Sequence, residues 1–270
     1  MKVYFGPAGV PLTSMKTDTV SGIGRVAELG LNSMEIEFVR GVKMGKPLAE
    51  EVGKAAERMR IKLSVHAPYF INLCNPEKAG DSQKRILDSC DRASRMGAWV
   101  VVFHPGYYGD LEKKKALEMV EKCCAEMAGV LKKQKPDVKL GLETTGKVSQ
   151  FGTVDEILEI CGRIDGCVPV LDWAHLYAIH KGKPDYGQIL ESVVSAGFRK
   201  IHTHFSNIEF TDKGERRHLT IDHKKPDFVD VAKTVLGSGL EEITFISESP
   251  VLEQDSLTMK KLFERVELAF

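Results

Sequence analysis

The sequence has no long apolar run, no excess of charge of either sign and no closely spaced cysteine pair of the zinc-binding type. A transmembrane helix needs about 20 consecutive apolar residues, so we expect no membrane span. The apolar stretch at the N-terminus is too short for a signal peptide. Lys and Arg together number 38, as do Asp and Glu. This balance excludes a strongly basic, histone-like binder of nucleic acid.

The cysteines also lack the Cys-x-x-Cys spacing of structural zinc sites. They are Cys74, Cys90, Cys123, Cys124, Cys161 and Cys167. In a chain of 270 residues this pattern predicts reduced, mostly buried thiols. We therefore expect a cytoplasmic, monomeric protein with no membrane partner.

Short apolar segments alternate with longer segments of helical periodicity along the whole chain. The predicted strands are residues 3–6, 33–38, 62–68, 99–104, 139–143, 168–173, 200–205 and 243–248. The predicted helices are residues 17–29, 47–60, 80–96, 111–133, 153–163, 185–196, 226–237 and 255–267. Eight such units without a linker predict an α/β fold, a single (β/α)8 TIM barrel over residues 1–270. We expect residues 206–225 to be a long irregular loop.

Six of the predicted strands end in a residue that can bind a metal. These residues are His66, His104, Glu143, Asp172, His202 and Glu248. Active sites of (β/α)8 barrels lie at the carboxyl ends of the strands, so all six side chains should meet at one opening. The chain has 8 His and 38 acidic residues among 270, about one residue in six, so chance does not explain this pattern.

Three imidazoles and three carboxylates at one opening would repel each other or stay protonated without cations. A mixture of His and carboxylate ligands favours Zn²⁺, with Mn²⁺ or Fe²⁺ as alternatives. Six ligands exceed the need of one catalytic zinc ion, but two ions sharing a carboxylate would use them all. Two ions about 3.5–4 Å apart are suited to phosphoryl displacement.

Three further histidines lie near these strand ends. His175 follows Asp172 by three residues, and His218 lies in the segment expected to be a long loop. His204 is two residues beyond His202 on the same strand, and we expect it to support a ligand from behind or to be structural rather than to be a ligand itself.

The loops at the same end of the predicted barrel are rich in basic residues. Arg40 lies in the loop after the second strand, and Arg216 and Arg217 lie in the segment after the seventh. Tyr69 lies just beyond His66. A protein without net charge can therefore still present a basic rim to a polyanion.

The segments that carry these residues resemble the endonuclease IV family of metal-dependent abasic-site repair enzymes, part of the wider group of xylose isomerase-like barrels. The matching segments are SVHAPYFINL (64–73), FHPG (103–106), GLETT (141–145), LDWAH (171–175), IHTHFS (201–206), RRHLTI (216–221) and SESP (247–250). They occur in the family's order and span almost the whole chain.

The resemblance implies a centre of three zinc ions. It assigns His66, His104 and Glu143 to the first ion, and Asp172, His202 and Glu248 to the second, with Glu143 as the bridge. It assigns His175 and His218 to the third ion.

The resemblance also implies an activity. Enzymes of the family cut DNA on the 5′ side of an abasic site, leaving a 3′-hydroxyl and a 5′-deoxyribose phosphate, and they trim 3′ blocking groups. The attack comes from a hydroxide bridging two metals, which gives Glu143 and Glu248 catalytic roles. Arg40 and Tyr69 match positions in loops that contact DNA, and Arg216 and Arg217 are further candidates.

One residue departs from the family pattern. The family has an Asp ligand of the third metal where this chain has Arg216, and an arginine cannot bind a cation. Three explanations remain open: Glu215 takes the role of the Asp, the third metal is weakly bound, or Arg216 itself supplies the positive charge.

Two other functions fit parts of the pattern. A sugar isomerase or epimerase of the same superfamily would need only Glu143, Asp172, His202 and Glu248, around one metal. His66 and His104 separate the two readings, because a one-metal isomerase has no evident use for them as ligands. A non-catalytic metal or nucleic-acid binding protein is the third possibility, but a complete ligand set argues against it.

Overall fold

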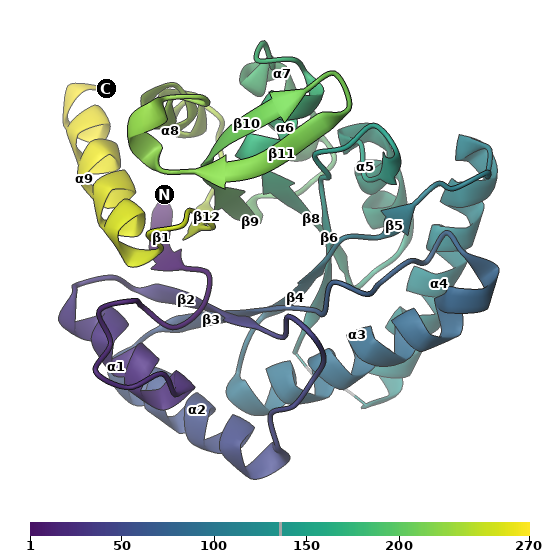
Figure 1. Ribbon diagram of the computed structural model, residues 1–270, viewed down its shortest axis with the longest axis horizontal. Helices are drawn as coiled ribbons and strands as arrows, with labels where there is room; N and C mark the ends of the chain where they lie inside the picture. Colours follow the sequence, from purple (N-terminus) through teal and green to yellow (C-terminus); the bar gives the residue numbers. More distant parts are fainter. Residues whose placement is uncertain (135–136) are drawn as a thin grey trace.

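The eight apolar segments form the parallel strands of one barrel in the computed structural model, which describes residues 1–134 and 137–270 (Figure 1). The strands are β1 (Lys2–Pro7), β2 (Ser33–Glu37), β3 (Lys62–His66), β4 (Val100–Phe103), β6 (Lys139–Glu143), β8 (Cys167–Asp172), β9 (Lys200–Phe205) and β12 (Glu242–Ser247). Their order is β1-β12-β9-β8-β6-β4-β3-β2. The predicted (β/α)8 barrel is confirmed.

The barrel closes between β1 and β2. The two strands meet at a bridge between Ala8 and Glu35, and the Gly9 amide donates to the Glu35 carbonyl at 2.9 Å. A Cβ atom on Gly6 would lie 1.8 Å from the Ser33 carbonyl oxygen. Only glycine therefore allows this close approach, which brings the side chains of β2 next to those of β12 and β9.

Helices surround the barrel, close to the ranges that the periodicity predicts. They are α1 (Thr19–Glu28), α2 (Lys46–Met59), α3 (Pro76–Met96), α4 (Lys113–Gln134), α5 (Val154–Arg163), α7 (Tyr186–Ser195), α8 (Phe228–Leu236) and α9 (Glu253–Ala269). Side chains of Asp18, Asn75 and Thr153 cap the first turns of α1, α3 and α5. Such caps satisfy amides that the helix itself leaves free.

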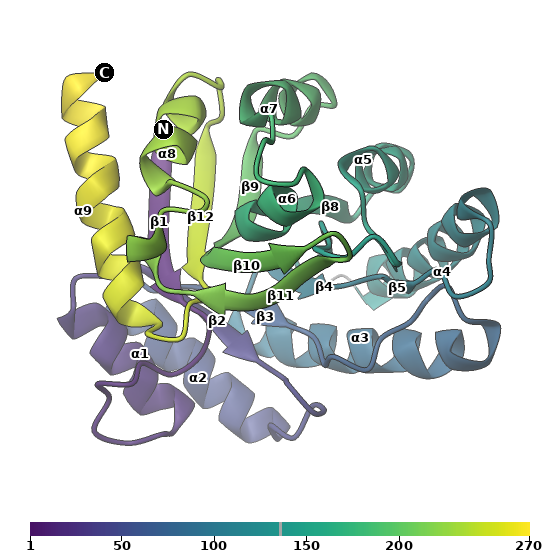
Figure 2. The same ribbon diagram turned by 45° about the horizontal axis from the view of Figure 1, so that its top comes forward.

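The segment after β9 is not an irregular loop, so that expectation was wrong. It forms a hairpin of β10 (Asn207–Thr211) and β11 (Gly214–Leu219), followed by the short 3-10 helix η1 (Ile221–His223). The hairpin packs on α6 (Trp173–Ile179), a short helix after β8 that the sequence analysis did not predict (Figure 2). A short antiparallel pair, β5 (Gly106–Tyr107) and β7 (Gln150–Phe151), was also not predicted.

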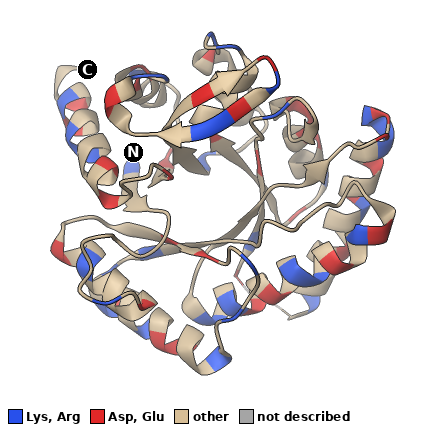
Figure 3. Ribbon diagram, viewed as in Figure 1, with Lys and Arg blue, Asp and Glu red and all other residues tan. Residues whose placement is uncertain are grey.

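The core lies between the strands and the helices. Phe5, Phe228, Phe245 and Phe263 pack together where β1 and β12 meet α8 and α9. All six cysteines are buried and free, as predicted. Charged residues lie mainly on the outer helices and on the hairpin (Figure 3). Among the described residues, no helix is both long and apolar enough to cross a bilayer.

Candidate metal centre

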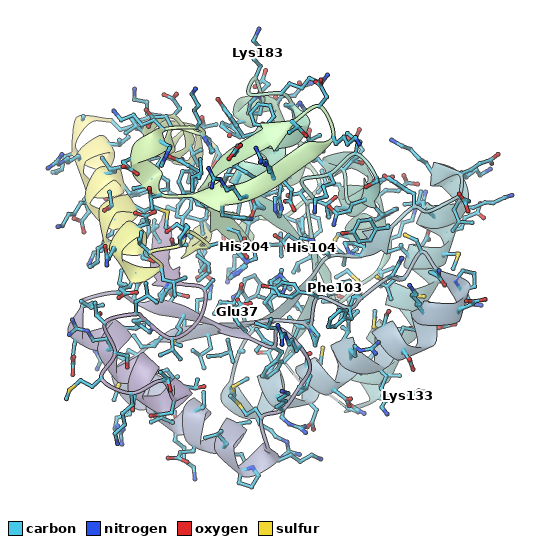
Figure 4. The ribbon with its side chains drawn as sticks, in the orientation of Figure 1. Glu37, Phe103, His104, Lys133, Lys183 and His204 are labelled. Carbon is cyan, nitrogen blue, oxygen red and sulfur yellow. The ribbon has the colours of Figure 1, made fainter. Side chains whose placement is uncertain are left out.

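The strand-end residues cluster at the carboxyl end of the barrel, where His66, His104 and Glu248 line a cavity. His66, Glu143 and Asp172 are the last residues of β3, β6 and β8, and His104 and Glu248 directly follow β4 and β12. The cavity has a volume of about 580 Å³. Figure 4 shows His104 and His204 near the centre of the barrel. The predicted placement of the strand-end side chains around one opening is thus what the fold produces for these five residues.

The first group of possible ligands consists of His66, His104 and Glu143. The Nε2 atoms of His104 and His66 lie 2.8 and 3.2 Å from Oε2 of Glu143. Nδ1 of His66 lies 2.8 Å from the Ala67 carbonyl, which keeps a proton on Nδ1 and turns Nε2 toward Glu143. Burial opposes ionisation of Glu143, but His104 and His204 hold its pKa well below the usual value.

The second group consists of Glu143, Asp172, His204 and Glu248, whose ligand atoms lie within 4.8 Å of one another. Nδ1 of His204 lies 2.9 Å from Glu143 and 3.4 Å from Glu248. Oδ2 of Asp172 is buried without a hydrogen-bond partner, and burial raises the pKa of Asp172 to about 8. A buried carboxylate oxygen without a partner, beside two other carboxylates, fits a divalent cation.

The assignment of His202 as a ligand in this group needs correction, because the structure places His204 there. Residues two apart on a strand point to the same side, so both imidazoles point into the barrel but at different depths. His204 lies one layer closer to the mouth. His202 lies below it, with Nε2 2.8 Å from Glu35 and its ring against Trp99.

The third group consists of His175, Glu215 and His218. Nε2 of His175 lies 2.6 Å from Oε2 of Glu215. Burial opposes ionisation of Glu215, but the hydrogen bond and charge of His175 lower its pKa to about 2. Of the three explanations for the departure at Arg216, the geometry supports the one in which Glu215 takes the role of the Asp.

A β-bulge explains how Glu215 reaches this position. Glu209 pairs with Arg217 and the next residue, Phe210, pairs with Glu215, so Arg216 is an extra residue in β11. The extra residue shifts the alternation of the strand. Glu215 and His218 both face the cavity, whereas Arg216 and Arg217 both bind Glu209 on the outer face, each at 2.6 Å.

The predicted DNA-contacting residues are all exposed, but only Tyr69 among them lines the cavity. Tyr69 is 66% exposed and its ring lies 6.2 Å from that of His66. Arg40 is exposed in the loop after β2. Arg216 and Arg217 are exposed on the outer face of the hairpin, so neither provides charge inside the cavity.

Two acidic residues of β2 escaped the sequence analysis. Glu35 is fully buried against His202 and His204, and Glu37 lines the cavity. Burial raises the pKa of Glu37 to about 8. The signal was present in the sequence, because two carboxylates at alternate positions of a buried strand, SMEIE, have no place in an ordinary apolar core.

Comparison with known proteins places this arrangement in a family. Residues 23–264 match the family described as xylose isomerase-like TIM barrel. The chain belongs to this family. The family and the clustered ligands together identify an enzyme of the xylose isomerase-like superfamily with groups able to bind metal ions.

The relatives carry different names. An uncharacterized protein of Methanocaldococcus jannaschii is 34% identical over 274 residues, which cover 98% of each chain. A probable endonuclease 4 of Mycoplasmopsis synoviae is 28% identical over 197 residues, covering 70% of this chain and 69% of its own. The low identity to the endonucleases fits a divergent branch.

Solved structures share the fold. A D-tagatose 3-epimerase-like protein has a TM-score of 0.76 at 21% identity, covering 100% of this chain and 98% of its own. The endonuclease IV of Thermus thermophilus has a TM-score of 0.74 at 17% identity, with both chains covered fully. At these identities the likeness establishes the barrel and leaves the reaction to the site.

Proposed function

We propose that this protein is a metal-dependent phosphodiesterase that cleaves DNA on the 5′ side of abasic sites and trims 3′ blocking groups. The observation that carries the proposal is the position of Glu143. One of its oxygens faces His66 and His104, and the other faces His204. Glu143 thus belongs to two ligand groups at once, as a carboxylate bridging two ions would.

The orientation of the His66 and His104 rings toward Glu143 distinguishes this proposal from a sugar isomerase or epimerase with one metal. Both imidazoles would be superfluous in a site built on Glu143, Asp172, His204 and Glu248 alone. Divalent ions, with Zn²⁺ the first candidate, would supply activated water and neutralise charge on the phosphoryl group. The relatives named probable endonuclease 4 support the same reading.

The residues around the ions have separate tasks in this proposal. Glu143 and Glu248 would hold the metal ions that act on the phosphate, and Asp172 and His204 would complete the second ligand group. His175, Glu215 and His218 form a third group on the hairpin side. Tyr69 lies at the mouth, where its exposed ring can enter the gap that an abasic site leaves and stack on a neighbouring base. Arg40, Arg216 and Arg217 are available to phosphates farther along the strand.

A one-metal ketose epimerase is the second candidate. The group of Glu143, Asp172, His204 and Glu248 would suffice to hold its metal, and a D-tagatose 3-epimerase-like structure shares the fold. In that reaction Glu143 or Glu248 would have to act as a free base. The three imidazoles around Glu143 argue against such freedom for Glu143.

The test is a nicking assay on a duplex with one abasic site, with metal content measured on the same sample. Wild-type protein should cut 5′ to the site and carry at least two metal equivalents. Glu143→Gln should lower the rate on the order of 10³-fold or more, because both ligand groups lose a charge that they share. Circular dichroism and thermal unfolding check that the variant folds.

A ketohexose epimerisation assay on the same samples serves as the comparison. One tightly bound metal, no nicking and turnover of the sugar would replace the proposed function with the second candidate. If two metals are bound but the duplex stays intact, the proposed metal centre stands and the proposed DNA substrate is refuted.

A further inference from the structure

A carboxylate lies directly beneath His204. Oε1 of Glu35 is 2.8 Å from Nε2 of His204, the ring nitrogen that faces away from Glu143 and Glu248. The contact is a charge contact and not a regular hydrogen bond, since neither atom has a hydrogen-bond partner. Both side chains are fully buried, so water does not screen the contact.

Two other imidazoles of the centre are oriented by backbone carbonyls. Nδ1 of His66 lies 2.8 Å from the Ala67 carbonyl, and Nδ1 of His175 lies 2.9 Å from the Thr144 carbonyl. These contacts turn Nε2 of both rings toward the cavity. His204 has the opposite orientation, with Nδ1 toward the cavity, and its back is covered by a charged group instead of a carbonyl.

Glu35 is itself held in place. Its second oxygen, Oε2, lies 2.8 Å from Nε2 of His202, and its backbone carbonyl accepts from the Gly9 amide at the closure of the barrel. A carboxylate fixed on two sides keeps its direction when His204 changes partner. The closure of the barrel between β1 and β2 therefore determines where this carboxylate lies.

We propose that Glu35 is a positioning residue that keeps the proton of His204 on Nε2, presents Nδ1 to Glu143 and Glu248, and so strengthens divalent-metal binding there. The inference rests on the proposed metal centre. Carboxylates behind metal-binding imidazoles fix the tautomer and raise the basicity of the ligand, and their loss typically costs 10–100-fold in metal affinity. Glu35 acts through His204 and has no part in the reaction itself.

His202 is the control residue for this proposal, because it contacts Glu35 as His204 does but faces none of the carboxylates at the mouth. Glu35, His202 and His204 could in principle hold an ion among themselves, since their ligand atoms also lie within 4.8 Å. The proposal assigns no ion to this deeper layer, because Nδ1 of His204 already faces the carboxylates of the mouth. Replacement of the His202 imidazole by another hydrogen-bond donor to Glu35 should then matter little to metal binding.

The experiment titrates Co²⁺ and Zn²⁺ into chelator-treated protein against a competing chelator, for wild type, Glu35→Gln and His202→Gln. We expect Glu35→Gln to weaken the ion at the second ligand group about 10–100-fold without changing the number of ions at saturation. His202→Gln, whose amide can still donate to Glu35, should stay within about threefold of wild type.

A second readout does not depend on either variant. Long-range ¹H–¹⁵N spectra of metal-loaded wild-type protein should show His204 protonated on Nε2. A proton on Nδ1, or equal metal affinity of folded Glu35→Gln and wild type, overturns the inference and leaves the proposed function standing. Loss of one whole equivalent from both variants would place an ion in the deeper layer and also overturn it. Absence of bound metal from wild type would instead overturn both proposals.

Discussion

At the scale of single residues, the centre is a set of buried groups that shift each other's pKa values. His66 illustrates the balance. Burial would lower its pKa, but the hydrogen bond to Glu143 and the charges of Glu37 and Glu143 raise it to about 10. In the protein without metal, protons therefore occupy the positions that ions would take. Metal binding must release them.

The stability of the metal-free protein should fall as the pH rises. His66 binds its proton more tightly in the folded chain, so its contribution is complete below 6.5 and is lost as the pH rises to about 10. Asp172 acts in the same direction, because its pKa rises from 3.8 to about 8 on folding, mainly through burial. We expect the Tm of chelator-treated protein to fall between about pH 6.5 and 9.

Asp172→Asn provides the check on this prediction. It should remove part of the pH-dependent fall and stabilise the metal-free protein at pH 9 by about 1–3 kcal/mol, because it removes a buried carboxylate whose Oδ2 has no hydrogen-bond partner. Saturating Zn²⁺ should reduce the fall in wild type. A Tm of metal-free wild type that holds steady or rises over this range would contradict the account.

At the scale of elements, the hairpin of β10 and β11 decides the third group. Its bulge turns Glu215 inward, and the loop after β6 approaches it so closely that Gly146 has no room for a side chain. A Cβ atom on Gly146 would lie 2.4 Å from Oε2 of Glu215 and 2.7 Å from Cδ2 of His175. The position of the Glu215 carboxylate thus depends on the absence of a side chain at Gly146.

Gly146→Ala should displace Glu215 and weaken the ion at the third group, with the other two groups retained. The expected result is a loss of about one metal equivalent under mild chelation, measured by elemental analysis. Gly162→Ala in α5 is the matched control, because its Cβ atom would meet nothing within 4 Å. It should keep the full metal content. Equal metal content in both variants would show that Glu215 is not a ligand.

The hairpin also marks where sequence reasoning reaches its limit. The periodicity of single strands predicts the eight barrel strands and the strand-end residues His66, His104, Glu143, Asp172 and Glu248. It does not reveal the bulge in β11, because one extra residue in a strand leaves no signal in the amino-acid composition. For the same reason Arg216 seemed to stand at the position of the Asp. Which of His202 and His204 lies level with Asp172 likewise depends on the register between neighbouring strands, which appears only in the folded sheet.

At the scale of the whole molecule, the barrel gathers acidic residues and imidazoles of a chain without net charge at one end. The outer helices and the hairpin carry charges of both signs, interspersed with each other (Figure 3). Bound cations would add positive charge at the mouth that the composition does not count. Attraction of a polyanion to the mouth should therefore depend on the ions more than on the overall charge.

The most direct test of a multinuclear centre is a crystal structure of the zinc-loaded protein with anomalous data at the zinc edge. We expect at least two peaks, one among His66, His104 and Glu143 and one among Glu143, Asp172, His204 and Glu248. A third peak at His175, Glu215 and His218 would complete the centre. A single peak, with His66 and His104 both without metal, would contradict the account.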